Sequence, residues 1–211
     1  MKRPCADELL IFERELAESG SLTIAGVDEA GRGPLAGPVV ACCAVFDPGR
    51  PYPDAYDSKQ LSEKTRERLF DEITDSAIAI GIGLSDNVRI DEINILEATK
   101  EAMLAAVNEA ARKLGRFPDA VLVDHVHVPG MPAGIIQKSV THGDALSVSI
   151  AAASVIAKVT RDRLMAEYDK EYPGYGFAKH KGYGTKAHYE AIREIGASPI
   201  HRKSFLKSQG W

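Results

Sequence analysis

Residues Ile24 to Pro34 read IAGVDEAGRGP: an apolar run that ends in two adjacent carboxylates, Asp28 and Glu29, followed by a Gly-Arg-Gly turn. The apolar and β-branched residues at 23–27 predict a strand that ends at the acidic pair. Side chains alternate along a strand, so both acids can face one site only if the strand breaks, and Gly31 supplies the break. The stretch therefore predicts acidic side chains at a strand end, beside a turn that another backbone can approach closely.

These residue types suit chemistry on a nucleotide or a nucleic acid. Carboxylates bind hard divalent cations, and Arg32 can pair with a phosphate oxygen. In a chain that is 27% charged, an isolated acidic pair is more often part of the solvated surface. The position of Asp28 and Glu29 at a strand end is what favours a metal site over that alternative.

The length and composition predict one globular domain, or one domain with a small appendage. The chain has 211 residues, of which 45% are hydrophobic. No apolar run is long enough to span a bilayer, and the first twenty residues are typical of a short amphipathic helix rather than a secretory signal. We therefore expect a cytoplasmic protein without membrane contact, and a monomer. Cys42 and Cys43 are expected to point to opposite faces of a strand and to behave as buried hydrophobes.

The net charge of −4 hides an uneven distribution. Residues 151–211 carry 11 Lys and Arg against 6 Asp and Glu, a net of +5, whereas residues 1–150 carry a net of −9. A basic segment on an acidic body is typical of a local phosphate-binding surface. A solvated helix face would give the same count, so charge alone leaves both interpretations open.

The pattern of apolar residues predicts an α/β fold. Strands are expected at 23–27, 39–46, 77–84, 120–124 and, more weakly, 134–140. Helices are expected at 63–74 behind an N-cap at Ser62, at 94–114 ending at Gly115, at 144–167 and at 185–195. This order predicts a mixed sheet covered by helices, in which functional sites form beyond the strand ends.

Two further acids could join the pair. Asp124 ends an apolar strand just as Asp28 does, so the two carboxylates meet at one edge of the sheet if their strands are neighbours. Asp144 follows Gly143 at the expected start of a helix, where an N-cap role is as reasonable as metal binding. Four acids from separate elements could hold two divalent ions, as phosphoryl transfer requires.

Five segments, taken in order, resemble type 2 ribonuclease H, the ribonuclease HII family. They are IAGVDEAGRGPLAGPVV at 24–40, DSKQL at 57–61, SIAAASVIAKVTRD at 149–162, GYGTKAH at 182–188 and HRKSF at 201–205. The resemblance implies a ribonuclease H-like α/β fold, with a mixed β-sheet flanked by helices and a small helical C-terminal extension. We therefore expect an N-terminal helical extension over 1–20, a catalytic domain over 21–170 and a basic C-terminal helical extension over 171–211.

The resemblance also implies an activity. Enzymes of this family are metal-dependent endoribonucleases that hydrolyse the RNA strand of RNA/DNA hybrids. They also cut 5′ of ribonucleotides embedded in duplex DNA, leaving 5′-phosphate and 3′-hydroxyl ends. The expected partner is thus a nucleic acid, the cofactors are two Mg²⁺ or Mn²⁺ ions, and the setting is DNA replication and repair.

Site residues carry over from the matching motifs. The catalytic, metal-binding acids fall on Asp28, Glu29, Asp124 and Asp144. The turn that senses the ribose 2′-hydroxyl falls on Gly31, Arg32 and Gly33, and two lysines near phosphates fall on Lys59 and Lys181. The tyrosine that stacks on the sugar of the RNA–DNA junction falls on Tyr183, with Tyr175 as the alternative.

Other polar residues have ordinary structural explanations. Lys158 and Asp162 lie at i and i+4 on an expected helix, where pairing with each other is favoured over contact with DNA. His125 and His127 are expected two apart on a strand, where they could chelate a metal, but exposure or hydrogen bonding is favoured because the spacing suggests no third ligand. The C-terminal histidines, His180, His188 and His201, are expected to be neutral surface residues, and Phe205 and Leu206 to anchor the end of the fold.

Two other functions are compatible with such a fold. A nuclease or resolvase acting on plain DNA is disfavoured by the Gly-Arg-Gly turn, because DNA has no 2′-hydroxyl to recognise. A noncatalytic nucleic-acid-binding module is disfavoured by the four acids, because carboxylates repel phosphates unless cations lie between them.

Overall fold

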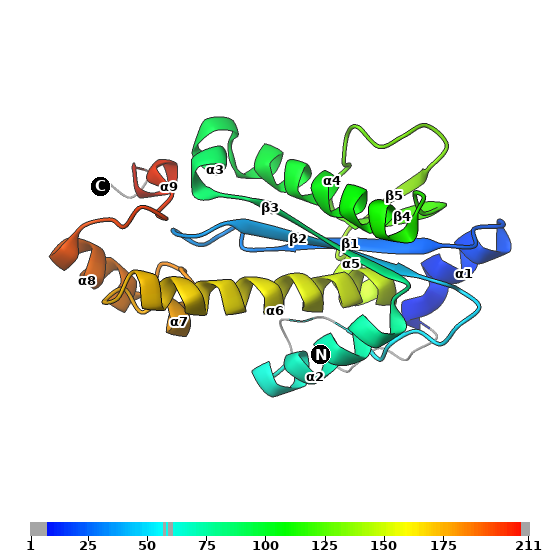
Figure 1. Cartoon of the computed structure of the whole chain (residues 1–211), viewed down its shortest axis with the longest axis horizontal. Helices are drawn as coiled ribbons and strands as arrows, with labels where there is room; N and C mark the ends of the chain where they lie inside the picture. The colour runs from blue at the N-terminus through cyan, green and yellow to red at the C-terminus, as the bar shows by residue number, and fades with distance from the viewer. Residues whose placement is uncertain (1–7, 57, 59–60, 208–211) are drawn as a thin grey trace.

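The computed structural model describes residues 8–56, 58 and 61–207, and within them a five-stranded mixed sheet lies between two layers of helices (Figure 1). The strands are β1 (Ile24–Ala30), β2 (Val39–Phe46), β3 (Ala79–Ser85), β4 (Ala120–Asp124) and β5 (Ile136–Val140). Their order across the sheet is β3-β2-β1-β4-β5, with β1 antiparallel to β2 and parallel to β4. The predicted mixed α/β sheet is confirmed.

Helices cover both faces of this sheet. One face carries α3 (Asn87–Ile93) and α4 (Ile95–Leu114), and the other carries α6 (Val148–Glu171) with α2 (Glu63–Ser76) packed outside it. The remaining helices are η1 (Glu8–Leu10), α1 (Ile11–Glu18), α5 (Gly143–Leu146), α7 (Phe177–His180), α8 (Lys186–Ile195) and α9 (Lys203–Lys207). Within the described ranges, no helix is long and apolar enough to cross a bilayer.

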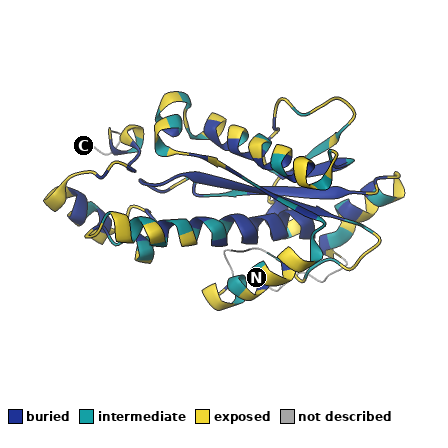
Figure 2. Cartoon of the chain, viewed as in Figure 1, coloured by how far each residue is buried: buried dark blue, intermediate teal, exposed yellow. Residues whose placement is uncertain are grey.

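The central strands are apolar on both faces because helices cover both. Every residue of β2 is buried, and Figure 2 shows the middle of the sheet in dark blue. Cys43 joins the core cluster beneath α4, whereas Cys42 joins the cluster beneath α6. Both cysteines are free, which confirms the prediction that they face opposite ways and behave as buried hydrophobes.

Caps fix several of the predicted helix ends. Ser62 accepts a hydrogen bond from Thr65 N at the start of α2, and Asn94 accepts from Leu96 N and Glu97 N at the start of α4. Gly115 ends α4 in the left-handed conformation, as predicted.

The predicted single helix over 144–167 is wrong. It is two helices, α5 and α6, separated by Ser147. The backbone of Ser147 is extended, and its side chain caps α6 by accepting from Ile150 N. The same hydroxyl donates to the carboxylate of Glu13 at 2.6 Å, so α1 helps to fix the interruption.

The C-terminal helices pack around the loop at 31–38 that follows β1. Leu35 N donates to Gly182 O at 2.8 Å, Gly37 N donates to Ile200 O at 2.9 Å, and Arg202 N donates to Leu35 O at 2.8 Å. Leu206 is buried and Phe205 packs against the same cluster, which confirms their predicted anchoring role. The segment after α6 is therefore joined to the acidic end of the sheet by backbone hydrogen bonds.

Candidate active site

A cavity of about 190 Å³ opens at the carboxyl ends of β1 and β4. Val27 pairs with Val123 across these two parallel strands, so the next residues, Asp28 and Asp124, lie side by side in the sheet. Both acids line the cavity, and Glu29 lines it too. The predicted convergence of acids from distant stretches at one sheet edge is therefore confirmed for these three.

Asp28 is the most buried of the three, with 3% of its surface exposed. Its Oδ1 accepts a hydrogen bond from Glu29 N at 2.8 Å. Burial raises the pKa of Asp28 well above its ordinary value, and repulsion from Glu29 and Asp124 raises it further, while a hydrogen bond with Ser154 opposes the shift. The site thus concentrates negative charge where water cannot screen it.

The strand runs three residues further than the sequence predicted, although the predicted break at Gly31 is confirmed. β1 continues through Asp28 and Glu29 to Ala30, and both acids keep antiparallel partners, Cys42 and Ala41. The break follows at Gly31, whose φ of 99° lies in the left-handed region. Because the cavity lies beyond the strand end, both carboxylates border it although they leave adjacent positions of a regular strand.

Asp144 is close to the acids in the fold but does not line the cavity. Gly143 N donates to Asp124 Oδ1 at 2.6 Å, which ties the start of α5 to the end of β4. Asp144 is buried, as the second residue of a helix whose N-cap position is His142. The alternative N-cap role for Asp144 is therefore wrong, since the helix begins one residue earlier.

The donor set suits a hard divalent cation. Carboxylates are the preferred ligands of Mg²⁺ and Mn²⁺, and a cation would relieve the repulsion that raises the pKa of Asp28. Among the residues with described positions, no three His, Cys, Asp or Glu side chains are already arranged as a metal cage. A metal site would therefore form by adjustment of the acids around the ion.

The Gly-Arg-Gly turn forms one wall of the cavity. A Cβ at Gly31 would overlap the guanidinium of Arg161, so only glycine fits there. A Cβ at Gly33 would lie 3.6 Å from the ring of Tyr183, an ordinary contact distance. Arg32 lies between the two glycines, 3.6 Å from the carboxylate of Glu29 and 40% exposed at its side chain.

The two tyrosines that competed for the stacking role have different positions. Tyr183 is 45% exposed and lines the cavity beside the turn. Tyr175 is buried, its ring stacks on Phe177, and its hydroxyl donates to Gly196 O at 2.9 Å. Only Tyr183 of this pair presents a ring to the cavity.

Residues 25–208 match the family model of Ribonuclease HII. The chain belongs to the ribonuclease HII family. A curated ribonuclease HII from Acetivibrio thermocellus is 53% identical over 201 residues, covering 95% of this chain and 76% of that protein. The crystal structure of ribonuclease H2 from Pyrococcus horikoshii OT3 has a TM-score of 0.71 at 29% identity, covering 89% of this chain and 96% of that one. The ribonuclease HII of Archaeoglobus fulgidus, solved as a complex with PCNA, has a TM-score of 0.66 at 25% identity and covers 86% and 94%.

Family membership makes the chain an endoribonuclease that cleaves RNA in RNA/DNA hybrids. The predicted ribonuclease H-like fold is confirmed by the same structural neighbours. A larger groove of about 640 Å³ lies between α3, α4 and α9, but both of its carboxylates are engaged: Asp91 accepts from Lys203 N and Ser204 N at the start of α9, and Glu92 pairs with Arg89. We therefore take the smaller cavity, with its three acids, as the candidate active site.

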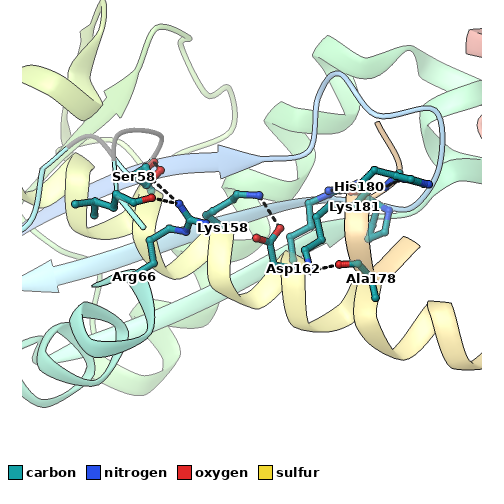
Figure 3. A network of polar contacts seen from close by, with 12 residues as sticks. Ser58, Arg66, Lys158, Asp162, Ala178, His180 and Lys181 are labelled. Carbon is teal, nitrogen blue, oxygen red and sulfur yellow. Dashed lines mark hydrogen bonds and ion pairs between the residues drawn. The ribbon is translucent and has the colours of Figure 1, made fainter. Parts of the chain in front are cut away.

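Cations lie along α6 beside this ribonuclease HII site (Figure 3). Lys158 lines the cavity and its Nζ donates to Asp162 at 2.6 Å, which confirms the predicted pair. The Nζ of Lys181 donates to Ala178 O at 2.6 Å, and Lys181 does not line the cavity. Arg66 donates to the carbonyls of Ser58 and Leu61, two residues of the DSKQL motif. Lys59 lies outside the described residues.

The histidines differ from the prediction in two ways. β4 ends at Asp124, so His125 and His127 are exposed residues of the following turn, with His125 at φ 59°, and not part of a strand. His188 and His201 are buried rather than on the surface, and their Nε2 atoms lie 3.0 Å apart. The basic composition around them gave no sign of a buried cluster, because the aromatic rings that cover the two histidines, Tyr175 and Phe177, come from the turn before α7 and from α7 itself.

Two buried arginines near the ribonuclease HII site were missed. Arg161 and Arg202 are at most 1% exposed, and both donate to backbone carbonyls of the loop at 31–38. The signal in the sequence was their place in two motifs of the family, VTRD and HRKSF. A charge in a motif does not reveal by itself whether it faces the substrate or the protein interior.

Proposed function

We propose that the enzyme cuts RNA/DNA hybrids and also cuts on the 5′ side of single ribonucleotides embedded in duplex DNA, leaving a 5′-phosphate and a 3′-hydroxyl. The observation that supports this specificity is the composition of one cavity. Asp28, Glu29 and Asp124 line it together with the Gly-Arg-Gly turn and Tyr183. Acids for metal-assisted hydrolysis and groups that could recognise a sugar thus border the same space.

The acids are proposed to bind the catalytic metal ions, Mg²⁺ or Mn²⁺, two of them during catalysis. Asp28, Glu29 and Asp124 would be direct ligands, and Asp144 would join them from α5, one residue after the amide that bonds Asp124. Bound divalent ions supply the positive charge that activates water and stabilises the leaving 3′-oxygen. The protein contributes a buried set of carboxylates whose mutual repulsion favours cation binding.

The turn and Tyr183 are proposed to recognise the ribonucleotide. The backbone groups of Gly31, Arg32 and Gly33 would hydrogen-bond the 2′-hydroxyl, which DNA lacks. Gly33 and the Tyr183 ring face each other without a side chain between them, so a sugar that stacks on the ring passes directly in front of the turn. Arg32, Lys158, Lys181 and Lys59 are proposed to contact phosphates of the two strands.

One assay tests the proposal. The enzyme is incubated with Mg²⁺ or Mn²⁺ and three labelled duplexes of one sequence: all DNA, DNA with one ribonucleotide, and an RNA/DNA hybrid. We expect cleavage of the hybrid, a single cut 5′ of the lone ribonucleotide, and an intact all-DNA duplex. EDTA should abolish both cuts. The proposal is contradicted by cutting of the all-DNA duplex, or by a ribonucleotide-containing duplex that binds and stays whole.

A further inference from the structure

Arg202 is a fully buried cation that holds the Gly-Arg-Gly turn from behind. Its Nη2 donates to Gly31 O at 2.6 Å, its Nη1 to Arg32 O at 2.8 Å, and its Nε to Gly37 O at 3.0 Å. Each side-chain nitrogen therefore has a backbone carbonyl of the same loop as its partner. Because a guanidinium is planar and rigid, these bonds fix the positions of the carbonyls relative to one another.

Among the described residues, the Arg202 side chain donates its hydrogen bonds to backbone carbonyls and not to a carboxylate, and Asp91 favours its charge only from a distance. Burial, with a smaller contribution from Arg161, lowers the pKa of Arg202 to about 9, so the group remains charged at neutral pH. A buried cation is costly unless its donors are satisfied, and apolar residues of similar volume often stabilise a fold equally well. The location of this charge therefore suggests a role in geometry rather than in stability.

The preceding residue, His201, reaches the other wall of the cavity through a second histidine. Ser198 N donates to His201 Nδ1 at 2.8 Å, so the proton of His201 is on Nε2 and points to His188 Nε2, 3.0 Å away. His188 then carries its proton on Nδ1 and donates to Tyr183 O at 2.9 Å. The hydrogen bonds thus run in one direction, from Ser198 to the backbone of Tyr183.

Two consecutive residues therefore hold two neighbouring parts of the cavity wall, the turn and Tyr183, against which a sugar would lie. Arg202 binds the carbonyls of Gly31 and Arg32, and His201 acts on Tyr183 through His188. The backbone bridge between Ala36 and His201 keeps this segment against the loop. A shift of the segment by a fraction of an ångström would change the gap between Gly33 and the Tyr183 ring.

We propose that His201 and Arg202 are positioning residues that set the gap between the Gly-Arg-Gly turn and Tyr183, and thereby determine the preference of the site for a ribonucleotide. Neither side chain lines the cavity. The proposal rests on the proposed function, because it concerns how the same cavity distinguishes a ribose from a deoxyribose.

Three variants test it: Arg202→Lys, His201→Gln and His201→Leu. Lysine keeps the charge but cannot reach three carbonyls in a planar fork. Glutamine keeps a donor at the position of Nε2, whereas leucine removes it. For each variant, kcat and KM are measured on the duplex with one ribonucleotide. The Kd ratio between the all-DNA duplex and that duplex is measured in Ca²⁺, and Tm gives the stability.

We expect Arg202→Lys to lower kcat/KM about 100-fold and to reduce the Kd ratio about tenfold, since small displacements of positioning groups have effects of this size. His201→Leu should also lower kcat/KM and reduce the Kd ratio, whereas His201→Gln should keep most of the wild-type Kd ratio. Val107→Ala, in the core beneath α4, is the control for lost stability. It should lower Tm while the Kd ratio stays within about twofold of the wild type.

The outcomes separate the two proposals. An unchanged Kd ratio in Arg202→Lys and His201→Leu, together with a lowered Tm, would show that the two residues serve stability alone and would overturn the inference. If Arg202→Lys does not fold, the comparison of His201→Leu with His201→Gln decides by the same criterion. A wild-type enzyme that ignores the ribonucleotide would instead refute the proposed function.

Discussion

Gly31 and Gly33 are two residues apart in one turn, yet the structure constrains them differently. Gly31 has a φ of 99° and would place a Cβ into Arg161, whereas a Cβ at Gly33 would lie at an ordinary contact distance from the ring of Tyr183. The first glycine is required by the protein itself. The second borders the space assigned to the sugar, so a methyl group there would compete with the substrate.

Alanine substitutions should separate these two effects. Gly31→Ala should lower the free energy of unfolding by about 2 kcal/mol or more, because strain and overlap add. Gly33→Ala should change it by less than about 0.5 kcal/mol and still lower kcat/KM on the duplex with one ribonucleotide about tenfold or more. Urea denaturation and steady-state kinetics measure the two quantities. A Gly33→Ala enzyme with wild-type kinetics would remove Gly33 from the recognition site.

Asp124→Asn tests the carboxylate cluster. The substitution keeps the size of the side chain but removes one negative charge facing the cavity. Turnover should fall about 100-fold or more, while Kd for the RNA/DNA hybrid changes little. Asp71→Asn, on the exposed face of α2, is the matched control and should keep the wild-type kcat. Nearly normal turnover of Asp124→Asn would exclude Asp124 from the catalytic set.

For single residues, the sequence predicted those positions that a local motif defines. Two apolar runs that each end in an acid predicted that Asp28 and Asp124 meet if their strands are neighbours, and the parallel pairing of β1 with β4 confirmed it. The burial of His188 and His201 could not be predicted, because it depends on side chains brought together by turns. The structural role of Arg202 could not be predicted for the same reason, since its partners are backbone carbonyls about 170 residues earlier in the chain.

Among the elements, β3 and α4 approach each other unusually closely. A Cβ at Gly81 would overlap the backbone carbonyl of Ala106, and a Cβ at Gly83 would overlap that of Ala102. The glycines alternate with Ile82 and Leu84, so on the face of β3 toward α4 the two central positions, 81 and 83, carry no side chain. This absence is what allows the helix backbone to rest on the strand.

Gly83→Val should therefore separate the two elements. We expect a loss of about 1–3 kcal/mol or more in the free energy of unfolding, because backbone atoms of α4 cannot rotate away from the new side chain. Leu84→Ala, on the opposite and exposed face, is the control and should cost less than about 0.5 kcal/mol. Chemical denaturation of both variants measures the difference. If Gly83→Val and Leu84→Ala lose the same free energy of unfolding, the close approach of β3 and α4 contributes nothing to stability.

The helices also show which boundaries the sequence pattern can predict and which it cannot. The ends of α2, α4 and α8 were predicted because Ser62, Asn94, Gly115 and Thr185 are local signals. The division between α5 and α6 was not, because it depends on Glu13. The carboxylate of Glu13 accepts from Ser147 Oγ at 2.6 Å and from Ser149 N at 3.1 Å. A contact across more than 130 residues leaves no periodic trace.

For the whole molecule, the two buried histidines predict a stability that depends on pH. Burial lowers the pKa of His188 and of His201 from 6.5 to about 4. Above pH 6.5 both histidines are neutral in the folded and the unfolded chain, so stability is full. Between pH 6.5 and 4 the unfolded chain binds protons first, and each histidine removes on the order of 2–3 kcal/mol. Below pH 4 the loss is complete.

NMR titration of the six histidines is the direct measurement. Two imidazoles should titrate near pH 4, and the free energy of unfolding should decline over the same window. His127→Gln, an exposed substitution, should leave that decline in place. If His188 and His201 instead titrate near 6.5 in the folded enzyme, the hydrogen-bond chain from Ser198 to Tyr183 is contradicted.

The backbone bonds between the loop at 31–38 and residues 182–202 have a consequence for biosynthesis. The ribosome makes the Gly-Arg-Gly turn early, but Gly182, Ile200 and Arg202, which hold its loop, are added about 150 residues later. A nascent chain that has already formed its sheet therefore still lacks a fixed turn. We expect stalled chains ending before residue 182 to be inactive toward ribonucleotides, so that cleavage begins only when translation of this region is complete.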